Sequence, residues 1–179
     1  MSRSSVMVPW SSIRDLSGAT GEVVEVSFRG DRVRGIAELD SAVISARLAG
    51  PYPRPITDLL NLDLVLATET HPSMDAEPAR LQVAVVPRQA PMAAIKRASQ
   101  WAAWCTRVAV IPAGAILRER AALEAQVRGV WVLDSDGVVL VNGHHGCWPT
   151  SRRGFLHRLL AEVLWEVLGA THPASKAVQ

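Results

Sequence analysis

Five cationic side chains and one tryptophan are candidates for contacting nucleic acid. They are Arg88, Lys96, Arg97, Arg152, Arg153 and Trp148. Arginine and lysine bind phosphate oxygens, and a tryptophan ring can stack on a base. If Arg152 and Arg153 open the last predicted helix, their charge opposes the helix dipole, and a bound anion would offset that cost. The alternative is that these cations are solvated or paired with acids on helix faces.

The sequence His144-His145-Gly146-Cys147 has side chains of the kind that bind zinc. Three neighbours in a row do not easily surround one tetrahedral ion, and a fourth ligand would have to come from Cys105 or His157. A polar surface loop that contacts phosphate or a partner is the alternative. We therefore predict no metal site from these residues alone.

The elements that must position these side chains follow from apolar patterning and turn residues. We predict strands at Glu22–Phe28, Arg32–Leu39, Ala42–Leu48, Leu62–Ala67, Arg80–Pro87, Val108–Ile111, Val130–Leu133 and Val138–Val141. We predict helices at Pro91–Thr106, at Ala115–Val127 and from Thr150 or Ser151 onward, after a short helical or irregular lead-in. One domain is expected over residues 1–179, with an N-terminal antiparallel meander (1–50), a core (58–141), a C-terminal amphipathic helix (151–169) and one continuous sheet.

The order of elements from Asp63 to Val141 resembles the core of the PD-(D/E)XK nuclease superfamily. The helix that contains Gln100 and Trp101 resembles that family's Gln-Ala…Tyr-Ala helix, with Arg97 where the family has glutamine. The strand Arg107–Pro112 resembles the Val-rich strand that ends in proline. The resemblance implies an α/β (α+β) fold with a central mixed sheet flanked by helices, like that of a restriction endonuclease.

The same resemblance implies where metal-dependent chemistry would lie. Asp63 stands where the family has its first acid, and Gln82 stands at one of the positions open to the second. Lys96 is a candidate for a displaced lysine, and Glu38, Glu69 and Glu77 are candidates for displaced acids. In that family two carboxylates hold the Mg²⁺ or Mn²⁺ that activates water. Where the family has its second acid and its lysine, this chain has the aliphatic segment Val83–Pro87. We therefore expect a scaffold that has lost most of its catalytic residues and needs no cofactor.

The composition permits several functions. The chain of 179 residues has a net charge of +2, which allows nucleic-acid binding without arguing for it, and two cysteines without metal-type spacing. The two cysteines are typical of a reduced, cytoplasmic protein, which we expect here. No apolar run approaches the roughly 18 residues that span a bilayer. The leading hypothesis is a DNA-associated protein. One alternative is a homodimeric or complex-forming subunit that uses the C-terminal helix with Trp104 and Trp165, and another is an active nuclease centred on Asp63.

Overall fold

The computed structural model describes residues 6–68, 74, 76–147 and 154–171. The strands are β1 (Glu22–Phe28), β2 (Asp31–Leu39), β3 (Ala79–Pro87), β4 (Thr106–Ile111), β5 (Trp131–Asp134) and β6 (Val139–Val141). The helices are α1 (Trp10–Ser17), α2 (Ser41–Leu48), α3 (Leu59–Thr68), α4 (Pro91–Ser99), α5 (Glu119–Val127) and α6 (Phe155–Thr171). All six strands form one mixed sheet, so the predicted α/β class is confirmed.

The strands lie side by side in the order in which they occur in the chain, β1-β2-β3-β4-β5-β6. β1, β2 and β3 pair antiparallel, β3, β4 and β5 pair parallel, and β6 returns antiparallel to β5. Because β2 pairs directly with β3, the N-terminal strands and the α/β part share a sheet, as the sequence predicts. The parallel strands are joined through α4 and α5, as parallel neighbours require a crossover connection.

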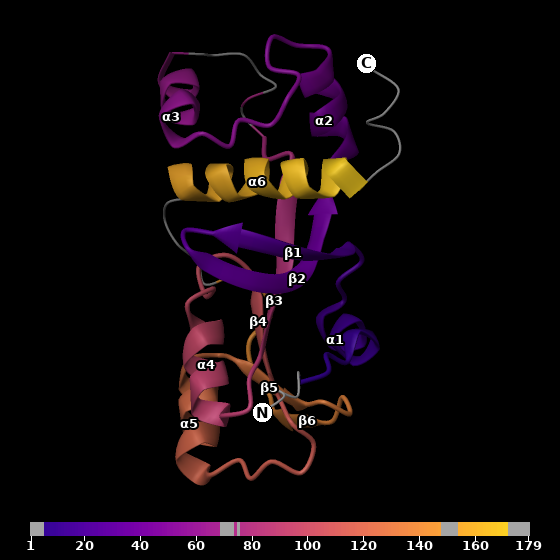
Figure 1. Cartoon of the computed structure of the whole chain (residues 1–179), viewed down its shortest axis with the longest axis vertical. Coiled ribbons are helices and arrows are strands. Elements are labelled where there is room, and N and C mark those ends of the chain that lie inside the picture. Colours follow the sequence, from indigo (N-terminus) through magenta and orange to yellow (C-terminus); the bar gives the residue numbers. More distant parts are fainter. Residues whose placement is uncertain (1–5, 69–73, 75, 148–153, 172–179) are drawn as a thin grey trace, which may run out of the picture.

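Helices cover both faces of the sheet (Figure 1). The core on one face contains side chains of α4, α5 and α6 together with Ala84 and Val86 of β3. The core on the other face contains Ile13 of α1 together with Val83 and Val85. β3 is therefore apolar on both faces over this stretch, which explains its continuous aliphatic sequence. Helices α2 and α3 lie beyond α6, at one end of the molecule (Figure 1).

Two predicted strands are wrong. Ala42–Leu48 lies in helix α2, because Asp40 caps its start by accepting hydrogen bonds from the backbone N–H groups of Ala42 and Val43, both at 3.0 Å. Leu62–Ala67 lies in helix α3, where the Asp58 side chain accepts a bond from the N–H of Asn61 at 2.8 Å. A short apolar run is compatible with a strand or with a helix. In both segments an aspartate that caps the first turn accompanies the helix.

The helices predicted at Pro91–Thr106 and Ala115–Val127 are confirmed in shorter form, and α6 confirms the C-terminal helix, whose predicted start at Thr150 or Ser151 lies outside the described residues. Helix α4 ends at Ser99 rather than Thr106, because the backbone N–H groups that follow bond three residues back, as that of Trp101 does to Ala98. Helix α5 begins at Glu119 rather than Ala115, since Arg118 has an extended backbone. The predicted strands Val130–Leu133 and Val138–Val141 form the short antiparallel hairpin β5–β6.

Candidate functional site

The three residues predicted as catalytic lie on different elements. Asp63 is exposed on helix α3, so the expectation of an acid on a strand is wrong. Lys96 is exposed in the last turn of α4. Helices α3 and α4 lie on opposite sides of α6 (Figure 1), so Asp63 and Lys96 do not share a site.

Gln82 occupies an irregular position in β3. The register between β2 and β3 shifts after Ile36, so that Ile36 faces Val83 while Ala37 faces Leu81. Gln82 is therefore the extra residue of a β-bulge, a device that redirects a side chain. Its Oε1 accepts a hydrogen bond from the N–H of Gly21 at 3.0 Å, and its Nε2 donates to Glu38 Oε2 at 2.9 Å. The amide thus ties the start of β1 to the end of β2.

A pocket lies between the end of β2, the start of β3 and the start of α6. Its volume is about 860 Å³. It is lined by Glu38, Leu39, Asp40, Ser41, Leu66, Met74, Ala76, Glu77, Ala79, Arg80, Gly154, Phe155 and Arg158. A concave site with a few convergent charged groups is the usual form of a small-molecule site.

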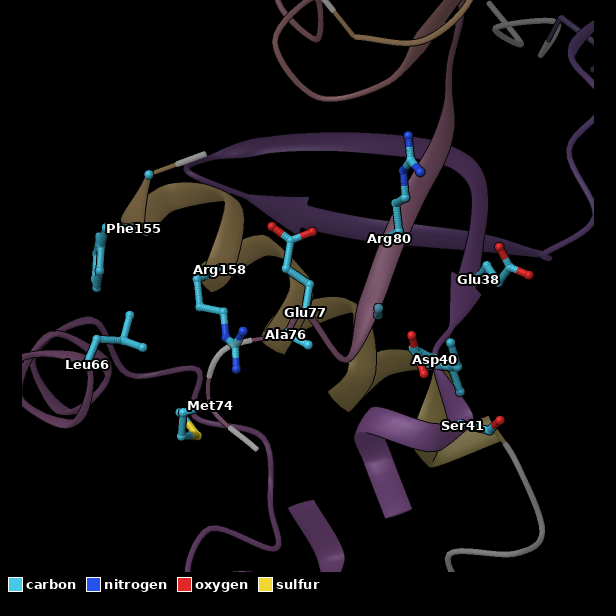
Figure 2. A pocket seen from close by; sticks show the side chains of 13 residues that line it. Glu38, Asp40, Ser41, Leu66, Met74, Ala76, Glu77, Arg80, Phe155 and Arg158 are labelled. Carbon is cyan, nitrogen blue, oxygen red and sulfur yellow. The ribbon is translucent and has the colours of Figure 1, made fainter. Parts of the chain in front are cut away.

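The pocket has two chemically different ends (Figure 2). Leu66, Met74 and Phe155 form an apolar end around Arg158. Glu38, Asp40 and Arg80 lie at the other end, with Glu77 between the two. Glu38 and Asp40 already accept hydrogen bonds, from Gln82 and from the start of α2. Glu77 and Arg80 form no ion pair with a described residue.

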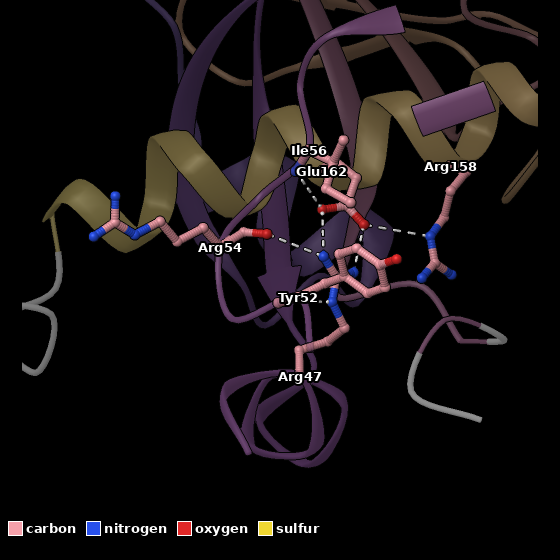
Figure 3. Close-up of polar contacts among 6 residues, drawn as sticks. All are labelled: Arg47, Tyr52, Arg54, Ile56, Arg158 and Glu162. Atoms are coloured by element: carbon pink, nitrogen blue, oxygen red, sulfur yellow. Dashed lines mark hydrogen bonds and ion pairs between the residues drawn. The ribbon is translucent and has the colours of Figure 1, made fainter. Parts of the chain in front are cut away.

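A buried ion cluster around Glu162 (Figure 3) adjoins the pocket, because Arg158 belongs to both. Arg47 and Glu162 are fully buried, with Nη1 2.7 Å from Oε1 and Nη2 3.3 Å from Oε2, a bidentate geometry. Arg47 also donates to the carbonyl oxygens of Tyr52 and Arg54, and Glu162 accepts from the N–H of Ile56. The Arg47–Glu162 pair therefore connects both α2 and the segment 52–56 that follows it to α6.

Arg158 is the third member of this cluster. It is 7% exposed, and its Nε lies 3.4 Å from Glu162 Oε1, at ion-pair distance but without hydrogen-bond geometry. Its Nη2 is buried and has no hydrogen-bond partner within the described part of the chain. Burial lowers the pKa of Arg158, and the negative charge of Glu162 partly opposes that shift.

Two of the predicted nucleic-acid contacts, Lys96 and Arg97, lie together at the end of α4. Arg97 Nη2 pairs with Asp31 Oδ1 at 2.5 Å, which joins α4 to the β1–β2 turn and brings Arg29 to the same region. Arg128 of the α5 end donates to Ser99 Oγ of α4 at 3.3 Å. We call Arg29, Lys96, Arg97 and Arg128 the cationic surface. Arg29 and Arg128 extend the set that the sequence predicts.

The remaining predicted contacts do not join this surface within the described residues. Arg88 follows β3, at the opposite end of α4 from Lys96 and Arg97. Trp148, Arg152 and Arg153 lie outside the described residues.

The His144–Cys147 segment packs on backbone and aromatic groups. Arg107 is buried and donates to the carbonyl oxygens of Gly129 at 2.8 Å and Gly146 at 3.1 Å. The ring of His145 lies 5.0 Å from that of Trp131. Cys105, one candidate fourth zinc ligand, is buried, and burial raises the pKa of its thiol well above the usual value although nearby Arg107 opposes the shift. Among the described residues, no three His, Cys, Asp or Glu side chains are grouped so that they could hold a metal ion.

The tryptophans predicted at a subunit interface contact other parts of the same chain. Trp165 is 6% exposed and lies under the Arg47 guanidinium, whose carbon is 4.9 Å from the ring centre. Trp104 is partly buried, with its ring centre 5.5 Å from that of Phe28 and 4.3 Å from that of His157. The dimer hypothesis requires Trp165 to lie at the surface, whereas its side chain is buried.

Comparison with protein-family models, with curated proteins and with solved structures finds no match to this chain. No helix in the described ranges is both long and apolar enough to cross a membrane.

Sequence reasoning missed the Arg47–Glu162–Arg158 cluster. A signal was present, because Glu162 interrupts an apolar run in the last helix and Arg47 lies in the apolar run Ala42–Leu48. Charged residues inside apolar segments are rarely buried unless they are paired.

Proposed function

We propose that this protein associates with nucleic acid through the cationic surface, on a nuclease-like scaffold that does not cleave. The observation that carries the proposal is the gathering of Arg29, Lys96, Arg97 and Arg128 from three separate elements at the end of α4. Arg29 and Lys96 form no ion pair with a described residue, so their charges are available to phosphate. Lys96 and Arg97 also suit the negative end of the α4 dipole, which is the purely structural explanation for them.

The order of elements supports the scaffold part of the proposal. β3, α4, β4, α5 and β5 follow one another in the order of the nuclease resemblance, with Pro112 directly after β4, while α2 and α3 separate β2 from β3. The strand that precedes β3 in the chain is β2 rather than the segment that contains Asp63. Glu38 at the end of β2 is then the acid that best replaces Asp63 in the series.

The burial of β3 supports the non-cleaving part of the proposal. Val83, Ala84 and Val85 are buried, and neither face of the strand presents a carboxylate or a lysine there. An acid and a lysine placed along that stretch could not reach a phosphodiester. Gln82 and Glu38 come before this stretch in the chain, but their side chains are hydrogen-bonded to each other.

We expect fluorescently labelled duplex DNA to bind with an affinity that falls as salt rises, with a slope of about −0.9 per neutralised phosphate on logarithmic axes. Lys96→Gln and Arg29→Gln should each reduce that slope by about 1. Arg118→Gln, an exposed arginine at the opposite end of α5 from Arg128, is the matched control and should leave the slope unchanged. Fluorescence anisotropy over a salt series measures these values, and absence of binding at low salt would remove the proposal.

The nuclease alternative is tested with the same DNA and Mn²⁺. We expect no cleavage. Cleavage that is lost in Glu38→Ala but kept in Asp63→Ala would establish an active site at the β2–β3 bulge, and the reverse result would restore the site expected from the sequence.

The interaction-subunit alternative is favoured by a separate observation on α3. Leu59, Leu60 and Leu64 are 50%, 77% and 62% exposed, an apolar surface on a helix at one end of the molecule. Exposed apolar patches often mark protein interfaces. This alternative becomes the preferred one if DNA binding is absent and the mass in solution, measured by light scattering, exceeds that of one chain and returns to it in Leu60→Glu.

A further inference from the structure

The buried cluster that adjoins the pocket has one more positive charge than negative charge. Arg47 and Arg158 are two guanidinium groups, and both lie against the single carboxylate of Glu162. Arg47 uses both oxygens of that carboxylate and two backbone carbonyls besides. Arg158 reaches only one oxygen, at 3.4 Å, so its charge is the one left without full compensation.

An uncompensated buried charge is costly, and proteins usually neutralise it or leave a place for a counter-ion. Within the described residues, no carboxylate other than that of Glu162 lies at ion-pair distance from Arg158. Glu77 is close enough to influence Arg158 electrostatically but does not pair with it. Arg158 lines the pocket, and its buried Nε and Nη2 have no hydrogen-bond partner among the described residues.

The surroundings of Arg158 restrict what the counter-ion can be. Leu66, Met74 and Phe155 surround it at the apolar end of the pocket, so an apolar body attached to the anion would find matching contacts (Figure 2). The acids Glu38, Asp40 and Glu77 outnumber the arginines Arg80 and Arg158 in the lining, so the pocket would repel a doubly charged phosphate more than a singly charged carboxylate. A guanidinium pairs well with a carboxylate through two parallel hydrogen bonds.

We infer that this pocket binds a small organic carboxylate, with its carboxylate on Arg158 and an apolar group against Leu66, Met74 and Phe155. The cavity of about 860 Å³ leaves room for a larger ligand whose N–H or O–H groups reach Glu38 and Asp40. The site is separate from the cationic surface and does not depend on nucleic-acid binding.

Phenylacetate is a suitable probe because it joins one carboxylate to one apolar ring. We expect it to bind the full chain with a dissociation constant on the order of 1 mM, measured by titration calorimetry or ligand-observed NMR. Phenylacetamide, the neutral isostere, and inorganic phosphate, which has no apolar body, should each bind at least about tenfold more weakly. Equal binding of phenylacetamide, or tighter binding of phosphate, would overturn the assignment.

Two variants locate the site. Arg158→Met should abolish phenylacetate binding. Glu77→Gln should strengthen it by about three- to fivefold, because it removes a competing negative charge, while Glu119→Gln on α5 should change nothing. If Arg158→Met does not fold, Glu77→Gln and the amide comparison still decide the question. An unchanged affinity in Glu77→Gln, unchanged binding in Arg158→Met, or no phenylacetate binding up to about 10 mM would each overturn the inference.

Discussion

Glu162→Gln is expected to lower the free energy of unfolding by about 3–5 kcal/mol. The substitution keeps the shape of the side chain but leaves the buried guanidinium of Arg47, and that of Arg158 beside it, without a negative partner. The N–H of Ile56 would still find an acceptor oxygen, so the loss comes from the charge rather than from packing. Because domains are stable by only about 5–15 kcal/mol, the thermal midpoint should fall strongly as well.

The control for this prediction is Glu124→Gln, which breaks a surface pair with Arg128. That pair has a similar distance of 2.6 Å, but its side chains are 43% and 31% exposed. We expect a loss of about 0.5 kcal/mol or less, as for exposed pairs spaced four residues apart on a helix. Chemical denaturation with unchanged slopes measures both variants. A loss in Glu162→Gln no larger than in Glu124→Gln would contradict the role given to the buried pair.

The double replacement Arg47→Met with Glu162→Leu distinguishes the effect of charge pairing from that of the hydrogen bonds that Arg47 donates to backbone carbonyls. Exchange of both charged partners for apolar residues is often neutral, while loss of one partner is not. We therefore expect the double variant, which leaves only Arg158 without its carboxylate, to be more stable than Glu162→Gln, which leaves both guanidinium groups without one. If it is equally unstable, the cluster contributes through its bonds to the Tyr52 and Arg54 carbonyls rather than through charge pairing.

Arg107→Met is expected to cost about 3–5 kcal/mol of unfolding free energy. Arg107 is fully buried at the start of β4, and its Nη1 and Nη2 donate to carbonyl oxygens from separate segments. Those oxygens belong to Ala102, Cys105, Arg128, Gly129 and Gly146. Methionine fills much of the volume but donates nothing, so several buried carbonyl oxygens would lose their partner.

The matched control is Arg128→Met, a half-exposed arginine at the end of α5, for which we expect a loss of at most about 1 kcal/mol. A second measurement follows the segment that Arg107 holds. Hydrogen exchange at the amides of Gly129 and Gly146 should accelerate in Arg107→Met more than exchange in β2 does. Equal stability of the two arginine variants would contradict this prediction.

The sequence by itself determined the strands at the centre of the sheet. Val83–Val86 and Val108–Ile111 are aliphatic without interruption and are bounded by proline, so they can only be buried, and both are. The hairpin β5–β6 was equally determined, because the turn-forming residues Asp134–Gly137 lie between the apolar runs Val130–Leu133 and Val138–Val141. The central strands follow from the local apolar pattern alone. A strand that is buried on both faces has no solvent-facing side, so its sequence is apolar throughout.

Only the tertiary structure decided the rest. Ala42–Leu48 and Leu62–Ala67 fit a strand and a helix equally well by pattern, and they are helices that pack beside α6 instead of extending the sheet. Arg47 and Glu162 meet across 115 residues of sequence, and Arg158 reaches the same carboxylate from one turn earlier in α6. No local pattern predicts that meeting, because the attraction between two charges depends on their distance and burial in the folded chain and not on their separation along it.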